Sequence, residues 1–316
     1  MIDSASRPVS RRIELLDVLR GIALLAMASY HFTWDLEFFG YLPPAYATEG
    51  GWRLYARGIA TTFLVLVGIG LVLADNPATR RRSRLRRLAL IVAGAAAITA
   101  ATAALTPQSF VFFGILHLIA FASISGLPLL LLPAWANALL AVAIMIAGNT
   151  LTTHLTDPRW LAWIGFSASP PISNDFVPVF PWFGVVVAGI ALGQALAASG
   201  LTARLAAWNP RLRKAAPLAW LGRHSLAFYL IHQPISIAVV AAVSFVAPPD
   251  QTRYFTQSCE RGCLPDRDAA FCTRYCACVR DDLTKQDLLA DTLMGRLDAA
   301  REAKVRESVA VCSLDP

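Results

Sequence analysis

A series of apolar segments, each close to the length that a helix needs to cross a membrane, limits the fold of this chain more than any other feature. A helix rises about 1.5 Å per residue, so about 20 apolar residues cross the hydrocarbon core. The candidate segments lie at about residues 15–36, 54–74, 88–106, 112–132, 134–150, 180–198 and 225–247. Because 56% of the 316 residues are hydrophobic and only 16% are charged, we predict an all-α polytopic membrane protein with about seven transmembrane helices.

Basic residues predict the orientation of these segments. They gather near the N-terminus, in the stretch "TRRRSRLRR" (79–87) and around residues 204–214. The positive-inside rule places such loops in the cytoplasm. With seven spans, the N-terminus is then cytoplasmic, and the connection at 151–179 and the C-terminal tail face outward. The short segment at 134–150 follows a very tight turn, and a miscount there would place the tail inside.

The predicted division is a cytoplasmic N-terminal segment (1–12), a transmembrane domain (13–247) and a Cys-rich, partly helical extracytoplasmic tail (248–316). We expect the protein in a bacterial inner membrane, with the lipid bilayer as a partner. The net charge of +7 lies in clusters between apolar segments, so topology accounts for it and nucleic-acid binding is not expected. Whether the chain forms homo-oligomers stays open.

The tail contains every cysteine of the chain, and an even number of cysteines in an outward-facing polar segment predicts a small domain held by disulfides. These residues are Cys259, Cys263, Cys272, Cys276, Cys278 and Cys312. The alternative is a zinc site in "CTRYCAC", but its spacing does not match a standard C-x2-C ribbon and the tail has no histidine. We therefore expect no metal. The pairing of the cysteines stays open.

Histidines lie within or beside the apolar segments, where polar side chains are costly and often functional. They are His31, His117, His224 and His232. His31 and Asp35 are four residues apart, so they share a helix face, and a carboxylate there can orient an imidazole. Asp17 and Arg20 are three residues apart and can neutralise each other. The alternative for each histidine is a hydrogen-bonded packing residue.

The stretch "LLDVLRGIALLAMASYH" (15–31) resembles the first helix of the heparan-α-glucosaminide N-acetyltransferase catalytic-domain family and, more distantly, of the broader transmembrane acyltransferases. Three further stretches agree in order: "FFGILHLIA", "DFVPVFPWFGVVVAGIALG" and "HSLAFYLIHQP". The resemblance covers roughly residues 11–247 and stops before the tail. The residues in these stretches to which we give structural roles are Asp17, Gly21, Gly114 and Pro234, the last as a kink in its helix.

The resemblance implies transfer of an acetyl group from cytosolic acetyl-CoA, used as a co-substrate, to an amino sugar or glycan outside. One departure concerns the histidine. In the eukaryotic enzymes an asparagine stands at the position of His31 and the catalytic histidine comes later, whereas the segment after His31 offers none here. The family's "GILQR" segment is "GILHL" here, which places His117 where the family has glutamine.

Candidate site residues follow from charge, side of the membrane and resemblance. The catalytic candidates, acting as base or as acyl carrier, are His31, Asp35, His117 and His232. The residues predicted to bind the phosphates of acyl-CoA are Arg20, Arg80, Arg81, Arg82 and Arg223. The residues predicted to bind the acceptor are Asp175, Trp182 and Gln233. The alternatives are topology alone for the arginine cluster and an interfacial aromatic belt beside Asp175.

Two other classes of function stay open. A transporter or flippase would also use intramembrane histidine and aspartate, although we find no repeated halves of the kind that transporters show. A non-catalytic membrane scaffold that presents the Cys-rich tail is the other alternative. It predicts that the intramembrane histidines can be replaced without loss of function.

Overall fold

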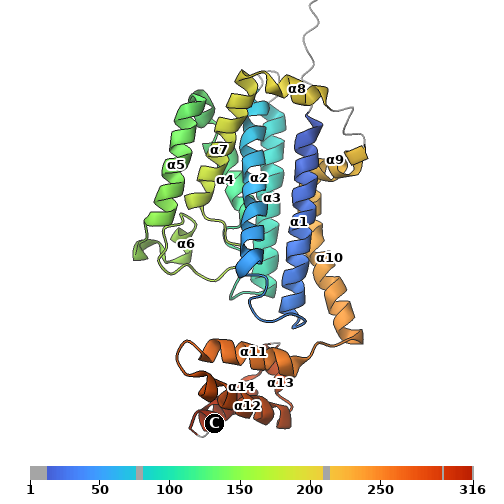
Figure 1. The fold of residues 1–316 in the computed structure, drawn as a ribbon, viewed down its shortest axis with the longest axis vertical. Helices are drawn as coiled ribbons and strands as arrows, with labels where there is room; N and C mark the ends of the chain where they lie inside the picture. Colours follow the sequence, from blue (N-terminus) through green and yellow to red (C-terminus); the bar gives the residue numbers. More distant parts are fainter. Residues whose placement is uncertain (1–12, 76–80, 209–213, 294, 315–316) are drawn as a thin grey trace, which may run out of the picture. The chain divides into compact units, whose positions relative to one another are not determined.

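The computed structural model describes residues 13–75, 81–208, 214–293 and 295–314, and within these ranges the chain is built of helices and turns without a β-strand (Figure 1). The prediction of an all-α polytopic membrane protein is therefore confirmed. Helices long and apolar enough to cross a membrane are α1 (Glu14–Phe38), α2 (Gly50–Leu73), α3 (Arg81–Leu105), α7 (Val179–Ala198) and α10 (Ser225–Val246).

Two further apolar helices, α4 (Ile115–Ser125) and α5 (Ala134–Thr150), are shorter than a full span. The prediction of one helix over 112–132 is wrong: α4 ends at Ser125, Gly126 caps it, and the 3-10 helix η1 (Pro128–Leu131) follows. Pro128 has no backbone N–H to continue the helical ladder, which explains the break. With 11 residues, α4 is only about 16 Å long, roughly half of the hydrocarbon core.

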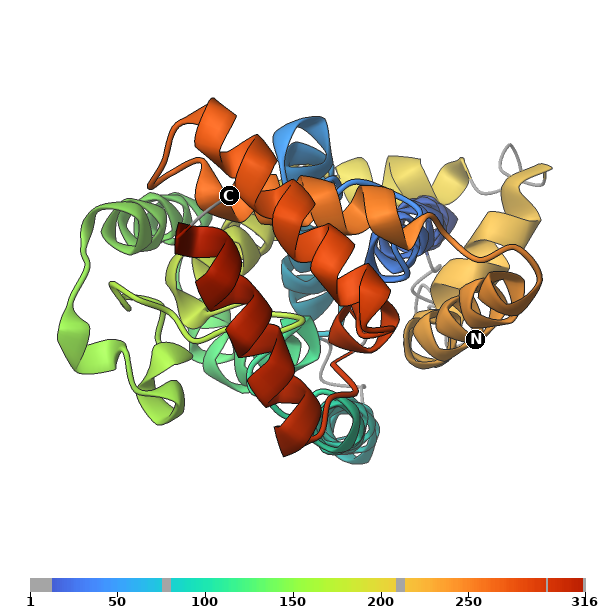
Figure 2. The same ribbon diagram turned by 90° about the horizontal axis from the view of Figure 1, so that it is seen from below.

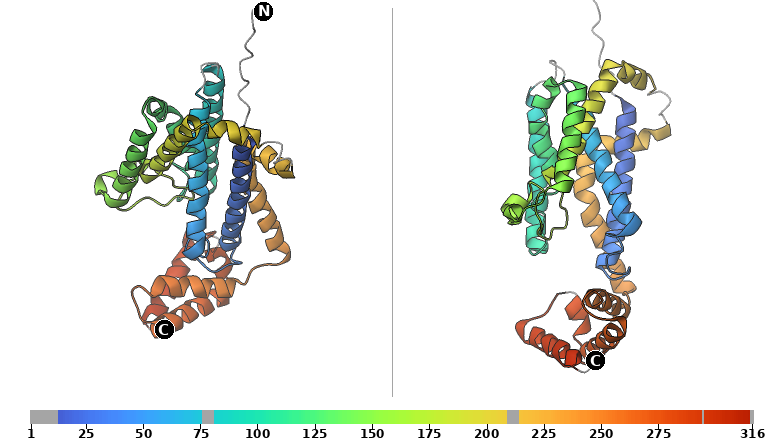
Figure 3. Two further views of the ribbon diagram at one scale, coloured as in Figure 1. Left: turned by 45° about the horizontal axis from the view of Figure 1, so that its top comes forward. Right: turned by 60° about the vertical axis from the view of Figure 1, so that its left-hand side comes forward.

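The helices pack into two compact units, of which the first contains Ala56–His232 together with the chain up to Met27. In this unit α5 lies along α7, and α3 lies beside α4 (Figures 1 and 3). Shorter helices complete it: η2 (His154–Thr156), α6 (Arg159–Ala162), α8 (Leu201–Ala207) and α9 (Ala216–Arg223). The apolar core joins α2, α4 and the start of α7, and its fully buried members include Leu64, Leu118 and Val186.

A buried asparagine satisfies the backbone where the apolar run is interrupted at η1. The Asn137 side-chain amide donates to the Leu129 carbonyl at 2.9 Å and to the Gln194 side-chain oxygen at 3.0 Å. Gln194 in turn donates to the Leu132 carbonyl at 2.8 Å. Backbone groups left without partners in lipid cost several kcal/mol. These two amides therefore make the break at η1 tolerable.

The second unit contains Ala28–Tyr55 and Gln233–Pro316. Its C-terminal part is a set of helices in which α12 contacts both α11 and α14 (Figure 2). These helices are α11 (Gln251–Cys263), α12 (Ala269–Lys285), α13 (Leu289–Leu293) and α14 (Ala299–Leu314). Leu283, Leu288 and Leu289 belong to a small apolar core of these helices.

Three disulfides hold the helices of the tail together, and they leave no free cysteine in the part of the chain that the structure describes. They join Cys259 to Cys276, Cys263 to Cys272, and Cys278 to Cys312. The first two link α11 to α12, and the third links α12 to α14. The prediction of disulfides rather than a zinc site is confirmed.

Candidate functional site

Four arginines line one cavity of the first unit. The cavity has a volume of about 460 Å³ and brings together Arg20 of α1, Arg86 and Arg87 of α3, and Arg223 of α9. Most of its other walls are apolar side chains from α1 to α4. A volume of this size lies in the range of small-molecule sites. Guanidinium groups that converge on an apolar cavity suit a ligand with several phosphate charges.

Two glycines bring α9 against the start of α1. A methyl group added at Gly21 would meet the backbone carbonyl of Leu218, and one added at Gly222 would meet the backbone carbonyl of Asp17. The helix backbones therefore touch at this point. Arg223 directly follows Gly222, so the contact carries its side chain to the cavity that Arg20 also lines.

The ion pair predicted from the spacing of Asp17 and Arg20 is present. Arg20 Nη1 lies 3.0 Å from Asp17 Oδ1, and Asp17 is only 1% exposed. A buried carboxylate without a partner would be costly, so the pair stabilises both charges. It also fixes the guanidinium group of Arg20 at the edge of the cavity.

Tyr229 of α10 connects the cavity to a carboxylate. Its ring lines the cavity, and its hydroxyl donates to Asp175 Oδ2 at 3.4 Å. The same oxygen accepts from the Ile115 backbone N–H at 2.9 Å, which caps the N-terminus of α4. Gly114 makes this approach feasible, because a side chain there would collide with the Asp175 carboxylate. We predicted Asp175 as a partner of the acceptor; in the structure this oxygen holds α4 and Tyr229.

His117 also forms a hydrogen bond at the start of α4. Its Nδ1 accepts from the Gly114 backbone N–H at 3.2 Å, and its Nε2 lies 3.2 Å from the Thr99 hydroxyl. Because the Thr99 hydroxyl donates to the Val111 carbonyl at 2.7 Å, the network assigns the ring proton to Nε2. Both ring nitrogens are then engaged. His117 therefore has a structural task, and catalysis by it would require the cap to open.

The second unit holds a separate polar group around Asp35, which is fully buried. Gln233 Nε2 donates to Asp35 Oδ1 at 2.6 Å, and the Ser236 hydroxyl donates to Oδ2. Two side chains of α10 thus hold the carboxylate. His31 lies one turn earlier on α1, half-buried, with its ring edge-on to Tyr30 at 5.6 Å between centroids.

The Gln233 side chain has one polar atom that can bind a ligand. Its side-chain oxygen is buried and accepts no hydrogen bond from any residue that the structure describes. A buried acceptor of this kind is costly unless something donates to it. The oxygen lies in the same polar group as Asp35, so it is a candidate contact for an N–H or O–H of a bound molecule.

His232 has a defined tautomer. Its Nδ1 lies 2.8 Å from the Tyr229 carbonyl and 3.2 Å from the Phe228 carbonyl, so the ring proton is on Nδ1. Nε2 is then the basic nitrogen. The Phe228 ring stacks on the imidazole at 5.7 Å between centroids. Pro234 follows two residues later, inside a helix that runs from Ser225 to Val246 without interruption.

The other predicted site residues lie elsewhere. Arg80 and the Arg81 side chain lie outside the described residues, and Arg82 is exposed on α3 and does not line the cavity. Trp182 packs on the apolar core of the first unit. Among the residues that the structure describes, no cluster of histidine, cysteine, aspartate and glutamate could hold a metal ion.

The sequence prediction covered only part of these groups. Arg86 and Arg87 belong to the arginine cluster that we predicted for the acyl-CoA phosphates, although the residues singled out within it lie one turn earlier. Tyr229 and Ser236 were not predicted, although a signal existed. Tyr229, Gln233 and Ser236 are spaced by four and three residues and therefore form a polar stripe on one face of α10.

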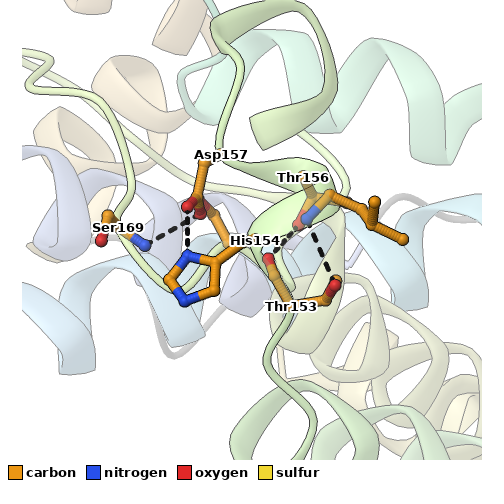
Figure 4. A network of polar contacts seen from close by, with 7 residues as sticks. Thr153, His154, Thr156, Asp157 and Ser169 are labelled. Carbon is orange, nitrogen blue, oxygen red and sulfur yellow. Dashed lines mark hydrogen bonds and ion pairs between the residues drawn. The ribbon is translucent and has the colours of Figure 1, made fainter.

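A further polar network lies in the loop between α5 and α7, outside the long apolar helices (Figure 4). Asp157 accepts from the Ser167 hydroxyl at 2.6 Å, from the Ser169 backbone N–H at 2.9 Å, and pairs with His154 Nδ1 at 2.8 Å. These hydrogen bonds, that from Ser167 first, hold the pKa of Asp157 well below its usual range. The carboxylate thus ties together residues 154–169.

Comparison with known proteins gives one match. The family model described as "Heparan-alpha-glucosaminide N-acetyltransferase, catalytic" matches residues 12–234, which is more than half of the chain. The matched residues include all four arginines of the cavity, Tyr229 and the polar pair of Asp35 and Gln233. The Cys-rich tail lies outside the match. No curated protein and no solved structure matches the chain significantly.

The close contact between α9 and α1 predicts that a methyl group added at Gly222 lowers the stability of the protein. Gly222→Ala should lower the melting temperature of the purified protein in detergent, because the new methyl group collides with backbone atoms, and overpacking costs about 1–3 kcal/mol. Gly58→Ala is the matched control, since a methyl group there meets nothing within 4 Å. Equal melting temperatures for the two variants would contradict the close contact.

The Asp157 network predicts a pH dependence. Because the carboxyl pKa is lower in the folded than in the unfolded chain, its stabilisation is complete above the unfolded pKa of about 3.9 and is lost as the pH falls toward the folded value. The melting temperature of Asp157→Asn should lie below that of wild type at pH 7, and the gap should shrink below about pH 4. Asp266→Asn is the control. A gap that is unchanged at pH 3 would refute the prediction.

Proposed function

The chain belongs to the heparan-α-glucosaminide N-acetyltransferase catalytic family, and we propose that it transfers an acetyl group from cytosolic acetyl-CoA to an extracytoplasmic amino sugar or glycan. The family is one of transmembrane N-acetyltransferases. The donor, the acceptor and the catalytic residues are our proposals for this chain. A donor and an acceptor on opposite sides require a site that both can reach through the membrane domain.

The arginine-lined cavity is the observation that carries this proposal. Acetyl-CoA has several phosphate charges and an apolar arm that ends in the thioester. Arg20, Arg86, Arg87 and Arg223 offer planar, permanently charged donors for the phosphates, and the apolar walls suit the arm. The positive-inside rule assigns these arginines to the cytoplasmic side, where the donor is found.

Two histidines suit the chemistry of transfer. A neutral imidazole can take the proton of the acceptor ammonium, so that the amine attacks the thioester carbonyl and the CoA thiolate leaves with a proton. Alternatively, the imidazole attacks the thioester itself and then passes the acetyl group to the amine. We propose His31 and His232 for this role. For His232, the tautomer leaves Nε2 as the basic nitrogen.

The acceptor is proposed to contact the polar group of α1 and α10. The unpaired oxygen of Gln233 can accept a hydrogen bond from a hydroxyl or ammonium, and the buried Asp35 carboxylate favours a positive charge nearby. Asp175 and Trp182, which we also proposed for the acceptor, have contacts that favour a supporting role, at the cap of α4 and in the apolar core.

The proposed topology has residues 1–12 in the cytoplasm, residues 13–247 in a bacterial inner membrane and residues 248–316 outside. The three disulfides of the tail support its outward side, because disulfides persist in oxidising compartments and are rare in the cytosol.

Acetyl transfer can be measured directly with the purified full-length protein. Labelled acetyl-CoA is incubated with a panel of amino sugars, and we expect label on the sugar. His31→Ala or His232→Ala should reduce the rate about 100-fold or more if that residue is the base or acyl carrier. Label retained on the protein would identify the acyl-carrier route. His154→Ala is the control. His154 lies in the loop between α5 and α7, outside the long apolar helices, so this variant should transfer at the wild-type rate.

A wild-type protein that neither binds acetyl-CoA nor releases CoA would refute the enzyme proposal and favour a transporter or a scaffold. Transfer that survives in both histidine variants would move the chemistry to another residue and leave the enzyme proposal standing.

If the cavity binds the donor, removal of one of its arginines should raise the KM for acetyl-CoA. Arg223→Ala and Arg86→Ala should each raise the KM for acetyl-CoA about tenfold or more, because a hydrogen bond to a charged group is worth about 1.5–3 kcal/mol. The effect should shrink as salt screens the charges. Arg204→Ala on α8 removes an exposed arginine that does not line the cavity and serves as the control. An unchanged KM in both cavity variants would contradict the assignment.

A further inference from the structure

A second cavity, of about 310 Å³, lies in the second unit where the Cys-rich tail meets the loop after α1. One side of it is the segment 40–43, and the other is the segment 249–257 at the start of α11. It therefore exists only while the tail is docked on this loop. The segment 40–43 lies within the family match, whereas no residue of the tail does.

Specific contacts hold the tail and the loop together. The Glu37 carboxylate accepts from the backbone N–H groups of Ala45 at 2.6 Å and Ala47 at 2.8 Å, which fixes the course of the loop. Arg261 of α11 pairs with Glu49 at 2.8 Å. The Tyr41 hydroxyl donates to the Ala247 carbonyl at 2.6 Å. The cavity is thus bounded by two segments with defined positions.

Side chains of both charges face this cavity from one face of α11. Asp250, Arg253 and Gln257 line it at spacings of three and four residues, which is the repeat of a helix face. Asp250 Oδ1 caps the helix by accepting from the Arg253 backbone N–H at 3.0 Å. Within the described residues, the Arg253 guanidinium and the Gln257 amide have no hydrogen bond or ion pair, so both can serve a ligand.

Aromatic side chains complete the cavity. The rings of Tyr41 and Tyr254 line it from opposite segments. A pyranose ring has an apolar face that packs on an aromatic ring and hydroxyls that need donors and acceptors at its edge. An amino sugar adds an ammonium, for which the Asp250 carboxylate is the complement. The volume is near the lower limit for ligand sites and suits one or two sugar units rather than a large molecule.

We infer that the Cys-rich tail, docked on the loop after α1, forms a binding subsite for an amino-sugar unit of the acceptor glycan. The inference rests on the proposed acetyltransferase function for its purpose, although not for the binding itself. Asp35 and Gln233, the proposed acceptor contacts, belong to the same unit as this cavity. The disulfides at Cys259 and Cys263 fix α11 to α12, so the polar face is held in place before the ligand arrives.

Direct binding tests the subsite without any acetyl donor. A β-1,4-linked glucosamine tetramer is titrated by calorimetry into the purified full-length protein in detergent, with the fully N-acetylated tetramer and maltotetraose as comparison ligands. We expect the glucosamine tetramer to bind more tightly than both. Arg253→Ala and Gln257→Ala should each weaken its binding several-fold, and Arg274→Ala on the exposed side of α12 should not.

Asp250→Asn removes the negative charge of the Asp250 side chain but keeps a residue that can cap α11. Asparagine caps a helix as well as aspartate does, so α11 should stay intact while the negative charge is lost. We expect this variant to lose the preference for the glucosamine tetramer over its N-acetylated form. Quantification of free thiols in every variant verifies that the tail has kept its disulfides.

The outcomes separate this inference from the proposed function. If the wild type does not bind the tetramer, or if the variants bind as wild type does, the subsite is wrong, even where acetyl transfer occurs. If the variants weaken binding as expected, the subsite stands, even where no acetyl transfer is found. If transfer occurs, the KM for the tetramer should rise in Arg253→Ala while the KM for acetyl-CoA and kcat stay unchanged.

Discussion

The contact between the backbones of α1 and α9 underlies the polar architecture of the first unit. Two helices approach this closely only where side chains are absent, and Gly21 and Gly222 provide that absence from both sides. The neighbouring residues are the ones that carry charge, since Arg20 precedes Gly21 and Arg223 follows Gly222. One steric requirement thus places Arg20 and Arg223, which are far apart in the sequence, on a single cavity.

A polar stripe on α10 holds one carboxylate in each unit. In the first unit Tyr229 bonds to the half-buried Asp175, and in the second Gln233 and Ser236 bond to the fully buried Asp35. Each carboxylate is held by donors, which offsets its partial or complete loss of water. The stripe therefore explains why an otherwise apolar helix carries three polar side chains on one face.

The sequence was sufficient for those features that depend on composition and short spacing. It predicted the apolar helices, the pairing of Asp17 with Arg20 and the presence of disulfides. It failed where tertiary contacts decide. Nothing local shows that Asp175 and His117 both hold the start of α4, or that Asp35 bonds to two side chains of α10. The pairing of the cysteines likewise depends on how the tail helices pack.

The shortness of α4 has a consequence for the backbone groups at its ends. A helix of about 16 Å is too short to join the two interfaces of a bilayer, so backbone groups at its ends must find partners in the protein. Asp175 and His117 supply them for Ile115 and Gly114, and the Thr102 hydroxyl accepts from the Val111 backbone N–H at 3.0 Å. Because Ile115 and Leu116 also line the arginine cavity, the hydrogen bonds that hold the start of α4 also hold one wall of that cavity.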